Sequence, residues 1–227
     1  MTAAASPVLT DAQFRKTGDI VHEDSGIILS ESKRSLLMAR LNRRLRTLSL
    51  GDYGAYCDRL DGPDGPQERR HLLSAITTNV TAFFREGHHF ESLAREVLPP
   101  LAPLARAGRR LRLWSAASSS GEEPYSMAVT LLDAIPDAAR HDVLILATDI
   151  DPEMVARSRQ GRFSAEALAP VPAAQARKYF QPCATGFEAR PEVRQIMRFD
   201  ELNLHDDWPF SGKFDVIFCR NTAIYFD

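Results

Sequence analysis

From residue 111 onward, the chain alternates short apolar runs with helical segments, and this alternation limits what it can fold into. The run Val143–Thr148 is almost entirely apolar, as in parallel strands that are buried on both faces. The expected elements, in the order strand, helix, strand, helix and strand, are Leu111–Ala116, Glu122–Ala134, Val143–Thr148, Pro152–Gln160 and Phe214–Cys219. Gly161, directly after the second helix, is a good C-terminal cap. Units of this kind form an α/β sheet with right-handed crossovers.

The chain before about residue 90 has a different, helical pattern. Thr10 and Ser30 are candidate N-caps, and a helix is expected from Lys33 to Leu48. One arc of about 100° on this helix is apolar and carries Leu37, Met38, Leu41, Leu45 and Leu48. Another helix is expected from Glu68 to about Ile76, after a loop rich in Gly and Pro. We expect an all-helical domain over residues 1–90, a linker with a connecting helix over 91–110 and an α/β domain over 111–227.

One segment does not fit the alternation. It contains three short strand-like pieces, Lys178–Phe180, Gly186–Ala189 and Val193–Met197, punctuated by Pro182, Gly186 and Pro191. Short apolar runs bounded by turn residues are typical of antiparallel strands. We therefore expect a small antiparallel β insertion at about residues 174–200.

Composition limits the classes of function. The chain has 227 residues, enough for a substantial core, and a formal net charge of −2, so no global charge attracts nucleic acid or a membrane surface. No run of about 18 apolar residues is present, so no membrane insertion is expected. The N-terminal segment lacks the basic and apolar regions of a signal peptide. Cys57, Cys183 and Cys219 fit neither a disulfide framework nor a metal spacing, so we expect reduced thiols, no metal site and a cytoplasmic location.

The loop Ser115–Gly121 joins the first expected strand to the helix that follows. Its small side chains would let a ligand approach the backbone, and the helix N-terminus offers free N–H groups. Glu122 and Glu123 follow at once, and two carboxylates repel a phosphate but attract an ammonium or sulfonium cation. The pattern therefore indicates either a site for a cationic ligand or a tight turn alone.

The second expected strand ends in Thr148-Asp149-Ile150-Asp151. A carboxylate at this position, about 25–30 residues after such a loop, commonly binds the ribose hydroxyls of a nucleotide-type cofactor. Asp151 precedes Pro152 and is better explained as a helix cap, which leaves Asp149 as the candidate ligand. A dinucleotide oxidoreductase shares this layout, but the loop has a single glycine and fits a pyrophosphate poorly.

Five motifs occur in a fixed order: Thr77–Glu86 (TTNVTAFFRE), Trp114–Ser126 (WSAASSSGEEPYS), Ala147–Asp151 (ATDID), Leu202–Leu204 (LNL) and Phe218–Asp227 (FCRNTAIYFD). They resemble the motif series of the CheR family, the protein-glutamate O-methyltransferases of bacterial chemotaxis. The resemblance runs from about residue 10 to the last residue. It implies a Rossmann-like domain that uses S-adenosylmethionine to methylate glutamate side chains of methyl-accepting chemotaxis receptors, with S-adenosylhomocysteine as product.

The resemblance also implies roles for individual residues. Arg85 and Tyr225 would be catalytic, because they would orient the acceptor near the transferred methyl group. Asp149 would hold the ribose, and Glu122 or Glu123 would contact the methionine portion. The residues implied to bind the cofactor are Asn79, Thr81, Arg85, Glu122, Glu123, Asp149, Asn203, Leu204, Arg220 and Asn221. The β insertion would match a family subdomain that can dock a receptor tail in relatives.

Ordinary structural roles compete with these assignments. Arg85 could form a surface ion pair with Glu86 or Glu91, Asn79 could be a turn residue, and Tyr225 could be a core aromatic. A basic stripe on the 33–48 helix consists of Lys33, Arg40, Arg43 and Arg44. It is either a solvated face or a docking surface for an acidic receptor helix.

The end of the sequence departs from the family pattern. Thr222-Ala223 stands where relatives carry two larger apolar residues, and the sequence stops at Asp227, where relatives continue. In a sheet of order 3-2-1-4-5-7-6, strands 3, 2, 1 and 4 would be present, and strand 4 would be an apolar edge. We therefore expect an incomplete methyltransferase domain. A non-catalytic module that binds the cofactor or a receptor stays open as the alternative function.

Overall fold

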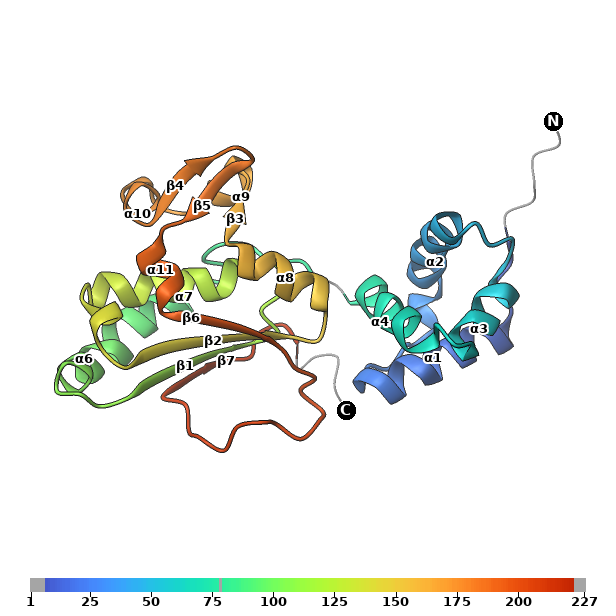
Figure 1. Ribbon diagram of the computed structural model, residues 1–227, viewed down its shortest axis with the longest axis horizontal. Helices are drawn as coiled ribbons and strands as arrows, with labels where there is room; N and C mark the ends of the chain where they lie inside the picture. Colours follow the sequence, from blue (N-terminus) through green and yellow to red (C-terminus); the bar gives the residue numbers. More distant parts are fainter. Residues whose placement is uncertain (1–6, 78, 223–227) are drawn as a thin grey trace. The chain divides into compact units, whose positions relative to one another are not determined.

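The computed structural model describes residues 7–77 and 79–222 (Figure 1). The chain divides into two compact units, and the second unit begins at Asn79 and ends at Asn221. The domain boundary expected at residue 90 and the linker expected over 91–110 therefore fall inside the second unit. The reason is that the segment after Asn79 packs with the sheet domain, as described below.

The first unit is helical, as expected. Its elements are α1 (Asp11–Ser25), the 3-10 turn η1 (Glu31–Lys33), α2 (Arg34–Leu48), α3 (Tyr53–Asp61) and α4 (Gly65–Ile76). Thr10 caps α1 in a reciprocal capping box with Gln13, which confirms the predicted start. Helix α3 was not predicted, and α4 begins inside the expected loop because Pro66 is well tolerated in a first helical turn.

Helix α2 buries the expected apolar arc, with Leu37, Leu41 and Leu45 inside. Two arginines of the expected docking stripe make contacts within the unit. Arg44 binds both carboxylate oxygens of the buried Glu68 at 2.8 Å each. Arg40 donates to the backbone carbonyls at the end of α4, including that of Thr77 at 2.9 Å. The stripe therefore divides into residues that hold this unit together and residues that face outward.

The second unit opens with a helical stretch made of α5 (His88–Ser92), the π-helical turn η2 (Leu93–Val97) and α6 (Leu98–Arg106). The Pro-rich segment expected to be a boundary is mostly α6, with Pro99 and Pro100 in its first turn. Leu98, Ala102 and Ala105 are buried in the core of this unit. The stretch is thus part of the sheet domain.

Four parallel strands form the main sheet in the order β6-β2-β1-β7. They are β1 (Leu111–Ala116), β2 (Val143–Asp149), β6 (Met197–Glu201) and β7 (Val216–Phe218). The helices on the intervening segments are α7 (Glu122–Ala134), the 3-10 turn η3 (Ala138–Arg140) and α8 (Pro152–Gln160). The predicted order 3-2-1-4 is confirmed, and within the described residues β7 is an edge strand with Ile217 53% exposed.

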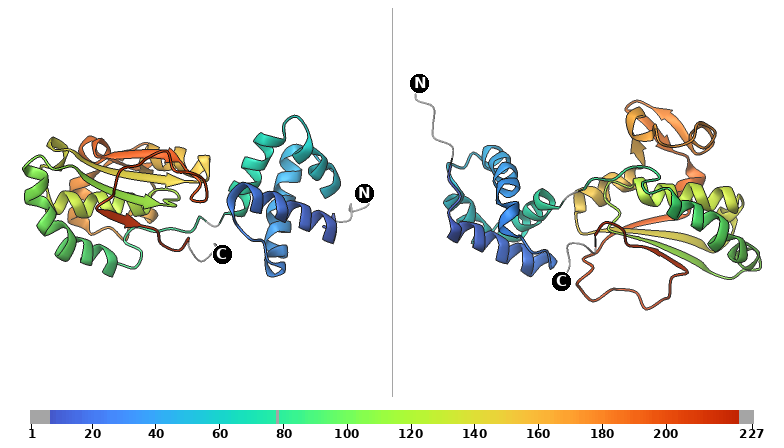
Figure 2. Two further views of the ribbon diagram at one scale, coloured as in Figure 1. Left: turned by 90° about the horizontal axis from the view of Figure 1, so that it is seen from below. Right: turned by 180° about the vertical axis from the view of Figure 1, so that it is seen from behind.

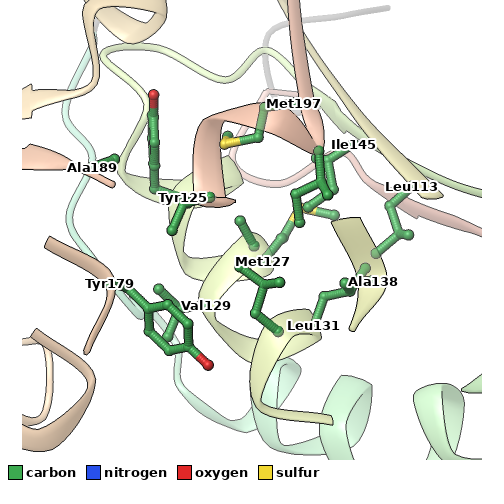
Figure 3. Packing of buried hydrophobic residues seen from close by; sticks show 14 of the residues in the cluster. Leu113, Tyr125, Met127, Val129, Leu131, Ala138, Ile145, Tyr179, Ala189 and Met197 are labelled. Atoms are coloured by element: carbon green, nitrogen blue, oxygen red, sulfur yellow. The ribbon is translucent and has the colours of Figure 1, made fainter. Parts of the chain in front are cut away.

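The two faces of the sheet are covered differently. Helices α7 and α8 lie on one face, where Leu113 and Ile145 pack with Met127 and Leu131 of α7 (Figure 3). The long segment between β6 and β7 passes over the other face (Figure 2). There an aromatic cluster surrounds the buried Trp114 and comprises Trp208, Phe210 and Phe214.

The antiparallel insertion is present, but its strands differ from those expected. The small sheet has the order β3-β5-β4, with β3 (Arg162–Phe163), β5 (Gly186–Ala189) and β4 (Phe180–Cys183). Its helices are α9 (Ala165–Leu168), α10 (Ala173–Tyr179) and α11 (Pro191–Gln195). The expected strand Val193–Met197 is instead the end of α11 followed by β6, which enters the main sheet. Asp133 of α7 ties α10 to the main core, because Tyr179 and Lys178 both donate to it.

No helix in the described ranges has the length and apolar character needed to cross a bilayer.

Candidate active site

The candidate residues lie where the parallel strands end. β1 runs into the loop of residues 117–121, β2 ends at Asp149, β6 leads to Asn203 and β7 leads to Arg220. In open α/β sheets, ligands bind at this carboxyl edge. The segment after Asn79 contacts the same edge, because the Ser119 hydroxyl donates to the Asn79 carbonyl at 3.1 Å.

The loop after β1 has an unusual backbone. Ala117, Ser119 and Gly121 all have positive φ, of 62°, 51° and 108°. A Cβ on Gly121 would lie 2.6 Å from Oγ of Ser158 in α8, so the glycine is needed for packing within the protein rather than for ligand approach. The Ser118 hydroxyl is buried and has no partner among the described residues. The loop therefore packs closely against α8, and it contains one buried hydroxyl, that of Ser118, without a partner among the described residues.

Asp149 fixes this loop from the end of β2. One of its oxygens accepts the Ser119 N–H at 2.7 Å, and the other accepts the Asp151 N–H at 3.0 Å. Burial raises the pKa of the Asp149 carboxyl, although these N–H donors oppose the shift. The Asp149 carbonyl accepts the Leu202 N–H at 3.0 Å, which brings the Asn203-Leu204 segment beside it.

Asp151 has the capping role that the sequence predicts, and one more. Its Oδ1 accepts the N–H of Glu153 at 2.9 Å at the start of α8. Its Oδ2 accepts the Asn79 side-chain amide at 3.1 Å. Asn79 therefore ties the entry of the sheet unit to α8, and the half-buried Thr81 follows in the same segment.

Glu122 and Glu123 differ in their surroundings. Glu122 is buried and accepts the hydroxyl of Ser120 at 2.6 Å within its own loop. Glu123 accepts the hydroxyl of Ser115 at 2.7 Å and the Arg220 guanidinium at 3.2 Å. Burial raises the pKa of Glu123 despite these partners. Glu123 is thus the carboxylate that faces the other strand-end residues.

Arg220 connects three parts of the site. Besides Glu123, its guanidinium contacts the Glu86 carboxylate at 3.2 Å and donates to the Arg85 carbonyl. Only 11% of the side chain is exposed, and the rings of Phe90 and Phe218 lie against it. These contacts hold the end of β7 against α7 and the 79–87 segment.

Arg85 is exposed and, within the described part of the chain, forms no ion pair with Glu86 or Glu91, the two partners that the alternative interpretation named. Its Nη1 donates to the Val80 carbonyl at 2.9 Å, and the side chain is exposed. The residues on both sides of it, Phe84 and Glu86, have φ of 52° and 55°. The backbone therefore presents Arg85 outward from a closed turn.

The remaining candidates are local. The Asn203 side chain forms a turn with the N–H of His205 and the carboxylate of Asp206. Leu204 packs in the aromatic cluster near Trp114. The Asn221 amide donates to Glu86 at 3.3 Å. Tyr225 lies outside the described residues.

Three residues of the site had no assigned role in the sequence. Ser115 and Ser119 lie inside the small-residue loop, and the only available signal was that they are small and polar. Glu86 ends the TTNVTAFFRE motif, and its position in that motif was the signal that could have found it.

Comparison with known proteins gives matches along almost the whole chain. Residues 12–77 match the family "CheR methyltransferase, all-alpha domain", and residues 79–227 match "CheR methyltransferase, SAM binding domain". The chain is 47% identical to a "Probable chemotaxis protein methyltransferase" of Rhizobium etli, over 92% of this chain and 79% of that protein. It is 41% identical to "Chemotaxis protein methyltransferase 2" of Pseudomonas aeruginosa, over 100% and 82% respectively. It is 39% identical to the "Chemotaxis protein methyltransferase" of Escherichia coli, over 96% and 76%.

Proposed function

We propose, from the premise that this chain belongs to the CheR methyltransferase family, that it transfers methyl groups from S-adenosylmethionine to glutamate side chains of chemotaxis receptors. The family and its methyl donor follow from the two domain matches. The proposal goes beyond these matches in two respects: the methylated group is a carboxylate, and the substrate is a chemotaxis receptor. The observation that carries it is that Arg220, after β7, bonds both Glu123 and the Arg85 carbonyl, at the same carboxyl edge of the sheet where β2 ends in Asp149.

The charges of the site fit S-adenosylmethionine. Glu123 and Asp149 place two largely buried carboxylates at the edge of the sheet. Carboxylates suit a sulfonium and an α-ammonium group, and they disfavour a pyrophosphate. A carboxylate has about four lone-pair directions, so Asp149 can accept ribose hydroxyls in addition to its two N–H donors. The unsatisfied Ser118 hydroxyl offers a further polar contact.

We assign the cofactor contacts accordingly. Asp149 binds the ribose, and Glu123 attracts the cationic end of the methionine portion. The segments that flank Asp149 and Arg220 complete the site, with Asn79, Thr81, Glu122, Asn203, Leu204 and Asn221 as further lining residues. Because Asn79 and Glu122 already bind Asp151 and Ser120, their contribution is mainly to hold the backbone of the site.

S-adenosylmethionine supplies a methyl group on a sulfonium. A glutamate acceptor is already ionised at neutral pH, so the protein needs no general base. Transfer to the glutamate would form an oxygen–carbon bond as the carbon–sulfur bond breaks, and both charges would disappear. Water stabilises the charged reactants, so a site that excludes water favours the reaction, and alignment of acceptor and donor contributes more. Arg85 orients the acceptor carboxylate loosely, because a tight ion pair would weaken the nucleophile. Tyr225 is proposed to help Arg85 orient the acceptor.

The receptor-docking proposal now rests on the outward-facing part of the basic stripe. Arg43 is exposed on α2, whereas Arg40 and Arg44 make the contacts described above. Lys33, at the start of this helical stretch, is half-buried. A positive face of this kind suits an acidic helical bundle.

The proposed function is tested by methyl transfer itself. The chain is incubated with radiolabelled S-adenosylmethionine and a purified cytoplasmic fragment of a chemotaxis receptor. Label in the fragment is expected, together with a strong decrease in the Asp149→Ala variant. Calorimetry with S-adenosylhomocysteine and with NAD runs in parallel. Binding of S-adenosylhomocysteine without any transfer would instead support a non-catalytic module.

A further inference from the structure

Three polar groups lie close to the carboxylate of Glu86. The Arg220 guanidinium forms an ion pair with Oε2 at 3.2 Å, and the Asn221 amide donates to Oε1 at 3.3 Å. The Nδ1 atom of His89 lies 3.5 Å from Oε2 but forms no hydrogen bond with any described residue. Arg220 and Asn221 come shortly after β7 in the chain. Glu86 therefore joins the 79–87 segment to the end of the edge strand.

Both terminal nitrogens of the Arg220 guanidinium are held by contacts within this unit, whereas its buried Nε has no hydrogen-bond partner among the described residues. The guanidinium bridges two carboxylates, Glu86 and Glu123, and it lies against two aromatic rings. It also donates to the carbonyl of Arg85. Its position is therefore set by the two carboxylates together, and the position of the Arg85 backbone depends in turn on Arg220.

The Arg85 turn is anchored on both sides. On one side, the Phe84 N–H donates to the Ser126 hydroxyl at 2.9 Å, and the Phe84 ring packs on Phe90. On the other side, the anchor is Glu86, which is held by Arg220 and Asn221. The non-glycine residues Phe84 and Glu86, one on each side of Arg85, both have positive φ; this is costly, and such strain persists only where surrounding contacts enforce it.

An ordinary surface ion pair does not account for this arrangement. Glu91 on α5 forms such an ordinary surface pair: its side chain is 66% exposed, and its partner Arg95 lies 4.0 Å away. The Glu86 side chain is 40% exposed, yet its carboxylate accepts the Asn221 amide and pairs with a nearly buried guanidinium. The pKa of Glu86 is held below its usual value, first by the Asn221 bond and then by Arg220.

We infer that Glu86 is a positioning residue for methyl transfer, which fixes Arg220 and Asn221 and, through Arg220, the Arg85 turn. The inference rests on the proposed function. Glu86 touches no reacting atom in this account. Its removal should therefore lower kcat more than it weakens cofactor binding, because the carboxylates of Asp149 and Glu123 stay in place.

The test compares Glu86→Gln with Glu91→Gln, which removes the same charge five residues further along the chain, on α5. Turnover on a receptor fragment, S-adenosylhomocysteine affinity and the melting temperature are measured for both. Loss of a charge-assisted contact predicts a kcat about tenfold lower in Glu86→Gln, with affinity changed about threefold or less. Glu91→Gln should match the wild type in all three.

Two further measurements keep the inference open to refutation. In the double variant Glu86→Gln with Arg220→Lys, the loss of kcat should be smaller than the product of the single losses, since both act through one contact. The NMR signals of the Arg220 guanidinium should broaden in Glu86→Gln and stay sharp in Glu91→Gln. If the wild type is active and Glu86→Gln is equally active, the inference about Glu86 is overturned and the proposed function stands. A wild type that transfers no methyl group overturns the proposed function instead.

Discussion

The backbone N–H of Ser119 donates to Oδ2 of Asp149 at 2.7 Å, and this bond joins the loop after β1 to the end of β2. Asp149 is therefore both a candidate cofactor ligand and the residue that shapes the loop around the cofactor. Substitution of Asp149 should therefore weaken cofactor binding and also loosen the loop. This double role separates Asp149 from a carboxylate that only contacts a ligand.

Asp149→Ala is expected to weaken S-adenosylhomocysteine binding by about 1.5–3 kcal/mol, because hydrogen bonds to a charged acceptor are lost and the loop loosens. Calorimetry measures the affinity, and thermal unfolding measures the loss of the loop anchor. Asp200→Ala is the matched control, since this aspartate is exposed on the neighbouring strand β6. Unchanged affinity in Asp149→Ala would show that the ribose binds elsewhere.

Arg85→Ala is expected to lower kcat at least about tenfold while the cofactor affinity changes much less. The reason is that its exposed guanidinium is available to orient the acceptor, whereas Asp149 and Glu123 are the residues proposed to hold the cofactor. Steady-state kinetics on a receptor fragment give the effect. Arg95→Ala, whose side chain is 79% exposed, controls for surface charge. Full turnover in Arg85→Ala would remove Arg85 from the mechanism.

The pKa of Glu123 is raised by burial, and this predicts a pH dependence of cofactor binding. As the pH falls, Glu123 takes up a proton earlier than an ordinary glutamate, and the charge that attracts a cation is lost. S-adenosylhomocysteine affinity should therefore weaken toward acid pH in the wild type. Glu123→Gln should bind more weakly at neutral pH and lose part of this dependence. Parallel pH profiles in the two proteins would assign the dependence to another group.

Arg44→Ala is expected to destabilise the helical unit by about 3 kcal/mol, because it leaves Glu68 buried without its main partner. Burial opposes the charge of Glu68, but Arg44 outweighs it and keeps the pKa below the usual 4.5. A lowered pKa means that this stabilisation is present above about pH 4.5 and is lost as the pH falls through the folded-state value. Chemical unfolding at neutral and acid pH measures it.

Arg43→Ala is the control for that experiment, because Arg43 is the exposed neighbour on α2 and should leave stability unchanged. If α2 docks a receptor, Arg43→Ala should raise KM for the receptor, and the effect should shrink with added salt. A stability loss in Arg43→Ala equal to that of Arg44→Ala would contradict the separate roles of the two residues.

Local patterns predicted the elements whose signals are short-range. The strand Leu111–Ala116 and the helices Glu122–Ala134 and Pro152–Gln160 were expected with the bounds that the structure has. The expected strand Val193–Met197 was assigned to the insertion, whereas the strand of this region is Met197–Glu201 in the main sheet. A short strand has the same sequence pattern in a small antiparallel sheet as in a parallel one. Helix α3 was missed although its buried residues Tyr53, Tyr56, Cys57 and Leu60 have helical spacing, because its nine residues are shorter than the window over which a period is read.

The sequence named the candidate site residues, which stay a prediction, but it did not show their contacts. The motifs named Glu123, Arg220 and Arg85, yet nothing local showed that the guanidinium of Arg220 would meet carboxylates from positions 86 and 123. The helical wheel likewise grouped Arg43 with Arg44. It could not show that the buried Glu68, from another helix, would pair with Arg44 and not with Arg43. Pairings between distant segments depend on the tertiary fold.

The central claim is that this site esterifies receptor glutamates with the methyl group of S-adenosylmethionine. Mass spectrometry of a receptor fragment after incubation with the protein tests the bond directly. The account predicts the mass of one added methyl group on glutamate side chains, its removal by mild alkali, and its absence when Asp149→Ala replaces the wild type. An alkali-stable methyl group on lysine or another nitrogen, or no added methyl group at all, would contradict it.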